Sequence, residues 1–187
     1  MIDRALIVER GLVLKELKPY QAETVFRVVD QNRESLREFL PWLDFNMSAR
    51  DSENFILNAA KSNLAGTTLI LGVFFEDRFV GMVSFNNIQK VNRSAQIGYW
   101  LCASARGKGL MTKAVKRLID FGFRDLHLHR IEVRAAPHNA KSRAIPERLN
   151  FSAEGVLREV EWLYDRFHDL AIYGLLRSEW KVQVDAS

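Results

Sequence analysis

Residues 104–112, which read Ser-Ala-Arg-Gly-Lys-Gly-Leu-Met-Thr, constrain the fold more than any other part of the chain. They follow an extended run, residues 94–101, and lead directly into an amphipathic helical stretch, residues 112–124. Residues 129–135 then alternate apolar and polar side chains, which is typical of a strand. Because a helix crosses over between the two strands, they must lie parallel in one sheet. The sequence therefore predicts a β-α-β unit.

The loop of this unit has the composition of an anion-binding turn. Gly107 and Gly109 allow a ligand to approach the backbone closely, and Arg106 and Lys108 place cations beside them. The start of the following helix adds unpaired N–H groups and the positive end of its dipole. The pattern predicts a pyrophosphate site, but an ordinary glycine-rich turn between a strand and a helix has the same composition.

The N-terminal part of the chain predicts one strand and two helices. Residues 12–17 indicate the strand, and residues 20–33 carry apolar side chains at near-helical spacing. Ser48 and Asp51 resemble the capping box that begins a second helix, and Gly66 ends it.

The remaining segments predict further strands. Residues 68–75 and 78–85 are rich in β-branched and aromatic side chains and indicate a hairpin. A polar loop, residues 86–93, separates this hairpin from the strand that opens the β-α-β unit. Residues 154–176 predict a final hairpin.

A short helix is expected between the β-α-β unit and the final hairpin. It opens at Asn139 and Ser142, contains Pro146, which makes it short or kinked, and ends at Asn150 in a left-handed conformation. Together the elements predict a mixed α+β or α/β fold: a mostly antiparallel sheet with a central parallel strand pair and helices on both faces. Residues 1–187 contain no repeat or linker and are expected to form a single domain.

Charge and cysteine content narrow the class of function. The 27 Lys and Arg residues barely exceed the 23 Asp and Glu residues and form no basic run, so nucleic-acid binding is only a minor hypothesis. The single cysteine, Cys102, excludes an internal disulfide, and no metal-ligand spacing occurs. Residues 1–10 do not resemble a signal peptide, and no run approaches about 18 apolar residues. We therefore expect a cytoplasmic protein without a metal or a membrane partner.

Several segments occur in an order and spacing that one family shares: Val83-Ser84-Phe85-Asn86, Val91-Asn92-Arg93, Ile97-Gly98-Tyr99-Trp100-Leu101, Arg106-Gly107-Lys108-Gly109, Asn139 with Ser142, and Ser142-Arg143-Ala144-Ile145-Pro146-Glu147-Arg148. By these segments the chain resembles the GNAT acyltransferase superfamily, and within it the branch that acetylates the N-terminal serine or alanine of ribosomal proteins. The resemblance covers residues 69–180 and implies a GNAT-like three-layer fold.

The resemblance also implies which residues bind acetyl-CoA. The loop that follows the strand would hold the pyrophosphate through backbone N–H groups, and the strand edge would pair with the pantetheine arm and polarise the thioester carbonyl. The implied acetyl-CoA-binding residues are Trp100, Leu101, Cys102, Arg106, Gly107, Lys108, Gly109, Leu110, Met111, Thr112, Asn139 and Ser142.

Two positions depart from the family pattern. Ser104 stands where Gln or Arg is usual, and Gln96 stands where the branch often carries Glu, so an obvious catalytic base is missing. An α-amino group with a pKa of about 7.8 is about one third neutral at pH 7.5, whereas only about one Lys side chain in a thousand is neutral. The hypothesis is therefore that the enzyme acts on an α-amine, with a water as proton carrier.

The leaving thiolate needs only weak proton donation, for which Ser142 and Tyr99 are the catalytic candidates and Tyr164 a further tyrosine. Trp42 either lines the acceptor site or caps the core, and Asp44 either attracts a cationic amine or is a solvated turn residue.

The main prediction is an acetyl-CoA-dependent N-acetyltransferase that uses direct attack by the amine, with a ribosomal protein as one candidate acceptor. The alternatives are acetylation of a small amine, such as a polyamine or an antibiotic, and a noncatalytic acyl-CoA-binding sensor. An exposed strand or hairpin near the C-terminus makes a homodimer plausible.

Overall fold

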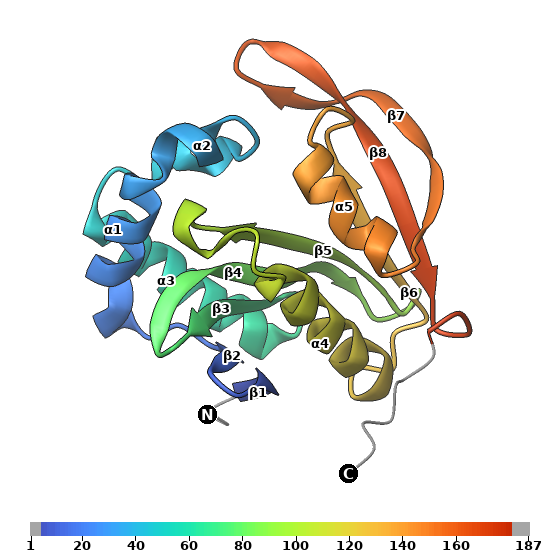
Figure 1. Ribbon diagram of the computed structural model, residues 1–187, viewed down its shortest axis with the longest axis horizontal. Coiled ribbons are helices and arrows are strands. Elements are labelled where there is room, and N and C mark those ends of the chain that lie inside the picture. The colour runs from blue at the N-terminus through green and yellow to red at the C-terminus, as the bar shows by residue number, and fades with distance from the viewer. Residues whose placement is uncertain (1–4, 181–187) are drawn as a thin grey trace.

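The computed structural model describes residues 5–180 and contains an eight-stranded sheet with the order β1-β2-β3-β4-β5-β6-β8-β7 (Figure 1). The strands are β1 (Ala5–Glu9), β2 (Leu12–Lys15), β3 (Leu69–Phe75), β4 (Arg78–Gln89), β5 (Ser94–Leu101), β6 (Arg130–Ala135), β7 (Ser152–Leu163) and β8 (Arg166–Leu176). The α-helices are α1 (Ala22–Gln31), α2 (Arg33–Arg37), α3 (Ala49–Ala65), α4 (Leu110–Arg124) and α5 (Ala140–Arg148), and the 3-10 helices are η1 (Pro19–Gln21), η2 (Pro41–Phe45) and η3 (Ala103–Ala105).

Neighbouring strands of this sheet are antiparallel except for β5 and β6, which are parallel. Helix α4 makes the crossover between these two strands, as the sequence predicts, although it begins at Leu110, slightly before residue 112. The expected mixed sheet with a central parallel pair is therefore confirmed.

Apolar side chains cover both faces of the sheet because successive residues of a strand point to opposite sides. Val83 and Leu101 belong to a buried cluster with α4, whereas their neighbours Met82 and Trp100 belong to a second cluster with α1, η2 and α3. Figure 1 shows α4 and α5 in front of the sheet and α3 behind it. The three expected layers are present.

The second predicted helix also follows its sequence signals. The Ser48 hydroxyl accepts a hydrogen bond from the amide of Asp51 at 3.2 Å at the start of α3. Gly66 ends the helix with a φ of +69°, a conformation in which glycine carries no Cβ penalty.

One strand was missed, and several predicted boundaries were wrong. Residues 5–9 form β1, which the sequence did not predict, and the strand predicted at 12–17 ends at Lys15. The helix predicted over 20–33 ends at Gln31, because Asn32 leaves the helical region before α2 begins. Strand β4 extends to Gln89, into the predicted polar loop, through an irregular register and a left-handed Asn87.

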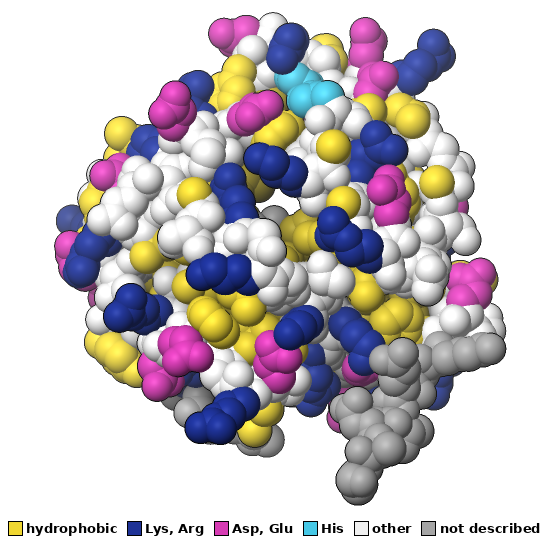
Figure 2. Space-filling model, in the orientation of Figure 1, with side chains coloured by type: hydrophobic (Ala, Val, Ile, Leu, Met, Phe, Trp, Pro, Cys, Tyr) yellow, Lys and Arg dark blue, Asp and Glu magenta, His cyan; other side chains and the backbone are white. Residues whose placement is uncertain are grey.

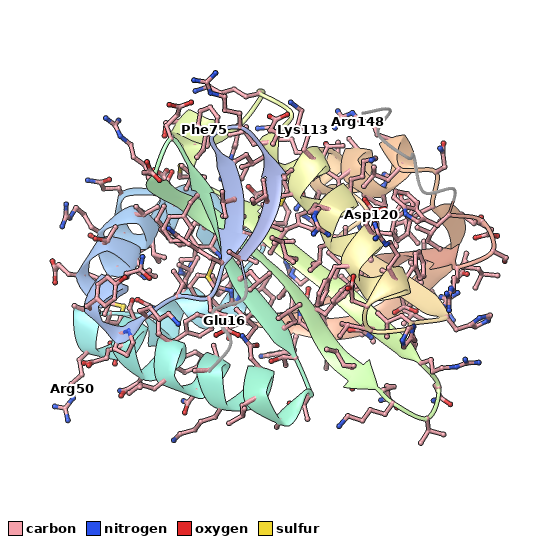
Figure 3. All side chains as sticks on the ribbon, turned by 90° about the horizontal axis from the view of Figure 1, so that it is seen from below. Glu16, Arg50, Phe75, Lys113, Asp120 and Arg148 are labelled. Atoms are coloured by element: carbon pink, nitrogen blue, oxygen red, sulfur yellow. The ribbon has the colours of Figure 1, made fainter. Side chains whose placement is uncertain are left out.

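Helix α4 is attached at both ends to distant parts of the chain. Lys113 forms an ion pair with Glu9 of β1 at 2.8 Å, and Asp120 accepts a hydrogen bond from the indole N–H of Trp180 at 2.7 Å. Figure 3 shows Lys113 and Asp120 along this helix. These contacts join α4 to β1 and to the segment after β8. Within residues 5–180, no helix has the length and apolarity needed to span a membrane.

Candidate active site

The sheet opens between the two parallel strands. The paired register of β5 and β6 runs from Ser94 and Arg130 to Ile97 and Val133. Strand β6 continues along β8, and residues 98–101 of β5 have no strand partner on the β6 side in the described part of the chain. Unpaired backbone groups at such an edge can pair with an extended ligand.

Leu101 directs its amide into this opening. The amide of Cys102 donates to the carbonyl of Val80 in the preceding chain segment at 2.8 Å. Backbone N–H groups alternate between the two edges of a strand, so the amides of Trp100 and Cys102 face β4, and those of Tyr99 and Leu101 face the opening. Among the three strand-end residues that the resemblance implies, Leu101 is the one whose amide can meet a ligand there.

Arg106 links the end of β5 to the N-terminal helices. Its Nε donates to the carbonyl of Leu101 at 3.0 Å, and its Nη2 donates to the hydroxyl of Ser35 at 3.3 Å. The guanidinium therefore lies beside the strand end, where it adds positive charge.

The glycine loop brings open backbone to the start of α4. Gly107 and Gly109 have φ values of +76° and +73°, which non-glycine residues adopt at a cost. Apart from the adjacent residues, no heavy atom of residues 5–180 lies within 4 Å of the Cβ position of either glycine. Helix α4 has no side-chain cap and no acidic residue in its first turn, whereas Ser48 and Asp51 supply both to α3. The start of α4 thus leaves its N–H groups and dipole available to an anion.

Three of the predicted residues meet on the far side of the opening. Asn139 caps α5 by accepting a hydrogen bond from the amide of Ser142 at 3.1 Å. The hydroxyl of Tyr99 on β5 donates to the carbonyl of Ser142 at 2.8 Å, and the Ser142 hydroxyl donates back to Tyr99 Oη at 3.3 Å. The structure therefore brings both catalytic candidates, Tyr99 and Ser142, into direct contact.

Burial raises the pKa of Tyr99 to about 12, and the hydrogen bond from Ser142 lowers this pKa by a smaller amount. The phenol stays protonated at neutral pH, and its proton lies in the hydrogen bond to the Ser142 carbonyl.

This raised pKa predicts an alkaline loss of stability. The pKa of an unfolded tyrosine is about 10, whereas that of the folded Tyr99 is about 12. Between these two values the unfolded state loses a proton that the folded state keeps, so the stability of the fold falls as the pH rises. Between pH 9 and 11, the free energy of unfolding of the wild type, measured by urea titration, should fall by roughly 1 kcal/mol more than that of Tyr99→Phe. Equal losses in the two proteins would contradict the burial argument.

A second group of side chains connects α2 and the following loop to the β7–β8 hairpin and to the loop between β6 and α5. The guanidinium of Arg37 lies 3.9 Å from the centre of the Tyr164 ring and pairs with Asp44 at 2.8 Å, which lowers the pKa of that carboxyl. The Phe39 and His138 rings lie 5.4 Å apart between their centres. Figure 2 shows a hollow in the surface between the N-terminal helices and α5, with Lys and Arg side chains on its rim.

Trp42, a candidate for the acceptor site, and Tyr164, a further candidate proton donor, have defined positions. Trp42 lies 6.2 Å from Trp100 between ring centres and packs against the second apolar cluster. Tyr164 Oη is buried without a hydrogen-bond partner in the described residues, and burial raises the pKa of this phenol. Sequence reasoning missed Phe39 and His138, because no local pattern indicates that these two loops meet.

The neighbourhood of Gln96 contains a carboxylate. Gln96 lies in register with Asn86 on β4 and with Glu132 on β6. Glu132, however, accepts hydrogen bonds from Arg130 at 3.1 Å and from Arg134 at 2.6 Å. Its negative charge is therefore engaged by two guanidinium groups.

The family model described as an acetyltransferase (GNAT) domain matches residues 11–152. The chain belongs to the GNAT acetyltransferase family. As a GNAT protein it is an acyltransferase, and the predicted resemblance is confirmed.

Individual relatives match nearly the whole chain. The chain is 34% identical over 175 residues to YdaF of Bacillus subtilis (strain 168), named provisionally as a ribosomal N-acetyltransferase, with 93% of this chain and 96% of YdaF covered. It is 28% identical over 166 residues to the ribosomal-protein-serine acetyltransferase of Escherichia coli (strain K12), with 89% and 93% covered. The crystal structure of the microcin C7 self-immunity acetyltransferase MccE in complex with acetyl-CoA and AMP has a TM-score of 0.87 at 32% identity, with 90% and 94% covered.

Proposed function

We propose that this GNAT protein transfers the acetyl group of acetyl-CoA to the α-amino group of a protein, and that the acceptor is a ribosomal protein. The observation that carries the proposal is that the open edge of β5 is followed, after η3 and the glycine loop, by the uncapped start of α4. An extended thiol arm and a pyrophosphate would each find backbone partners along one continuous path.

The cofactor would lie along this path in a defined direction. The pyrophosphate would accept hydrogen bonds from the amides of residues 107–112, with Arg106 and Lys108 supplying charge and Thr112 a hydroxyl. The pantetheine arm would pair with the edge at Leu101 and pass Asn139 and Ser142 on α5.

The reaction would be a direct transfer. The neutral amine attacks the thioester carbon, the new C–N bond forms, and the C–S bond breaks. The amide of Leu101 would stabilise negative charge on the carbonyl oxygen. The Ser142 hydroxyl would donate its proton to the departing thiolate and would receive in exchange, through water, the proton that the amine releases. Tyr99 would hold Ser142 in place during this exchange.

Two observations support an α-amine as the acceptor. Gln96 cannot accept a proton as a carboxylate does, and the neighbouring Glu132 is engaged by Arg130 and Arg134. An enzyme with this arrangement favours an amine that is already partly neutral. The two curated relatives named above carry names of ribosomal N-acetyltransferases.

A small-molecule acceptor is the second candidate, because the similar structure of MccE holds AMP together with acetyl-CoA. A single domain over residues 1–187, a homodimer and a cytoplasmic location stay predictions.

Purified protein mixed with acetyl-CoA and a panel of acceptors tests the proposal. The panel contains peptides with free N-termini, lysine peptides with blocked N-termini, and polyamines, and the readouts are CoA release and acceptor mass. We expect a gain of one acetyl group on α-amines alone. Transfer confined to small amines would support the second candidate, and binding of acetyl-CoA without transfer to any acceptor would favour a sensor.

A further inference from the structure

Pro146 leaves one carbonyl of α5 without its helical donor. In an α-helix the carbonyl of residue 142 accepts from the amide of residue 146, and proline has no amide hydrogen. Pro146 lies inside α5 and is buried, with helical residues before and after it. Ser142 is half-buried, so its carbonyl is partly shielded from water and gains from another donor.

Tyr99 supplies that donor from a different element. Its hydroxyl donates to the Ser142 carbonyl at 2.8 Å, although the two residues are 43 positions apart in the sequence. Tyr99 lies on the part of β5 that has diverged from β6, and Ser142 lies in the first turn of the helix that follows β6. The hydrogen bond thus spans the opening between the two halves of the sheet.

We propose that Tyr99 and Pro146 act as a pair of positioning residues that set the width of this opening. Pro146 frees the carbonyl, and Tyr99 uses it to hold the first turn of α5 at a fixed distance from the edge of β5. Ser142 and Asn139 are thereby placed opposite the Leu101 amide. The inference rests on the proposed function in one respect, namely that the thiol arm of acetyl-CoA occupies the opening.

This arrangement also separates the roles of the two hydroxyl groups. The single proton of Tyr99 is used by the carbonyl, and Tyr99 Oη accepts the proton of Ser142. When a thiolate forms in the opening, the Ser142 hydroxyl can turn to it while Tyr99 keeps its bond to the carbonyl. Tyr99 therefore acts through position and Ser142 through its proton.

The test is a double-mutant cycle of Tyr99→Phe, Pro146→Ala and the combined variant. In the wild-type background, Tyr99→Phe strands the carbonyl and should lower Tm by about 3–8 °C. In the Pro146→Ala background, the new amide of residue 146 can donate to the Ser142 carbonyl. Tyr99→Phe should then lower Tm by less than about half of the loss in the wild-type background. All three variants should nevertheless lose about tenfold or more in kcat/KM for acetyl-CoA, because the opening is no longer held at its working width.

Tyr173→Phe is the matched control. The Tyr173 hydroxyl also contacts α5, through Arg143 at 2.7 Å and Glu147 at 2.9 Å, but it comes from β8 and does not cross the opening. This variant should lower Tm and leave kcat/KM for acetyl-CoA within about twofold.

Equal Tm losses from Tyr99→Phe in the two backgrounds would overturn the exchange of donors, that is, the replacement of the missing amide of residue 146 by the Tyr99 hydroxyl. Unchanged kcat/KM in Pro146→Ala, or an equal kinetic loss in Tyr173→Phe, would overturn the positioning role. If the wild type neither binds acetyl-CoA nor transfers its acetyl group, the proposed function fails, and the positioning role fails with it. The Tm cycle still decides the exchange of donors in that case.

Discussion

Replacing Gly107 and Gly109 together by alanine is expected to weaken acetyl-CoA binding by about a hundredfold. Both residues have left-handed φ values, at which a side chain costs roughly 1–2 kcal/mol each. The loop would either keep this strain or relax and turn its amides away from the pyrophosphate. The open space at both Cβ positions means that the exchange meets no clash in the folded protein. Calorimetric titration with acetyl-CoA gives the dissociation constant directly.

Gly66→Ala separates backbone strain from ligand binding. Gly66 has a φ of +69° at the end of α3, and its Cβ position lies 3.7 Å from the Lys90 side chain. This control should lower Tm about as much as a single exchange of Gly107 or Gly109 by alanine, and it should leave acetyl-CoA binding unchanged. Normal binding by the double loop variant, or equally weak binding by Gly66→Ala, would show that the loop does not hold the pyrophosphate.

A peptide with a free α-amine should react about two orders of magnitude faster, in kcat/KM at pH 7.5, than the same peptide with a blocked N-terminus and one lysine. The pKa values of the two amines differ by about 2.6 units, or roughly 3.5 kcal/mol, so their neutral fractions at pH 7.5 differ by a factor of about 300. Gln96 offers no carboxylate to remove the extra proton. Initial rates of CoA release with the two peptides measure this ratio.

The pH profile distinguishes this explanation from simple shape selection. For the α-amine, kcat/KM should rise about tenfold per pH unit up to about 7.8 and then level off, whereas for lysine it should rise to about 10.4. Tyr99, with its pKa of about 12, should add no alkaline limb below pH 10. A profile that is flat below pH 7 with the α-amine would reveal a base that the structure does not identify.

Local signals explain which elements were predictable. The parallel pair followed from a glycine loop and an amphipathic helix within one short segment, and Ser48 and Gly66 marked the two ends of α3. Strand β1 escaped prediction because it is a short edge strand that pairs with β2 and contacts α4 through the ion pair of Glu9 with Lys113. Neither contact leaves a trace in the local sequence.

The candidate site divides in the same way. The loop glycines and the Asn139–Ser142 turn carry motifs that can be recognised along the chain. The open amide of Leu101 depends on the hydrogen-bond register with β4, which no motif specifies. The contact between Arg37 and Tyr164 joins residues that lie far apart in the sequence and arises only from the tertiary arrangement.

The division of the apolar interior into two clusters has a consequence for how such enzymes diversify. The cluster on one face of the sheet packs against α4, beside the proposed cofactor path, whereas the cluster on the other face packs against α1, η2 and α3. If the acceptor binds beside the N-terminal helices, mutations that change its site can accumulate on one face while selection preserves the other. Related enzymes with this fold could then change their amine acceptor while the proposed acetyl-CoA site stays the same.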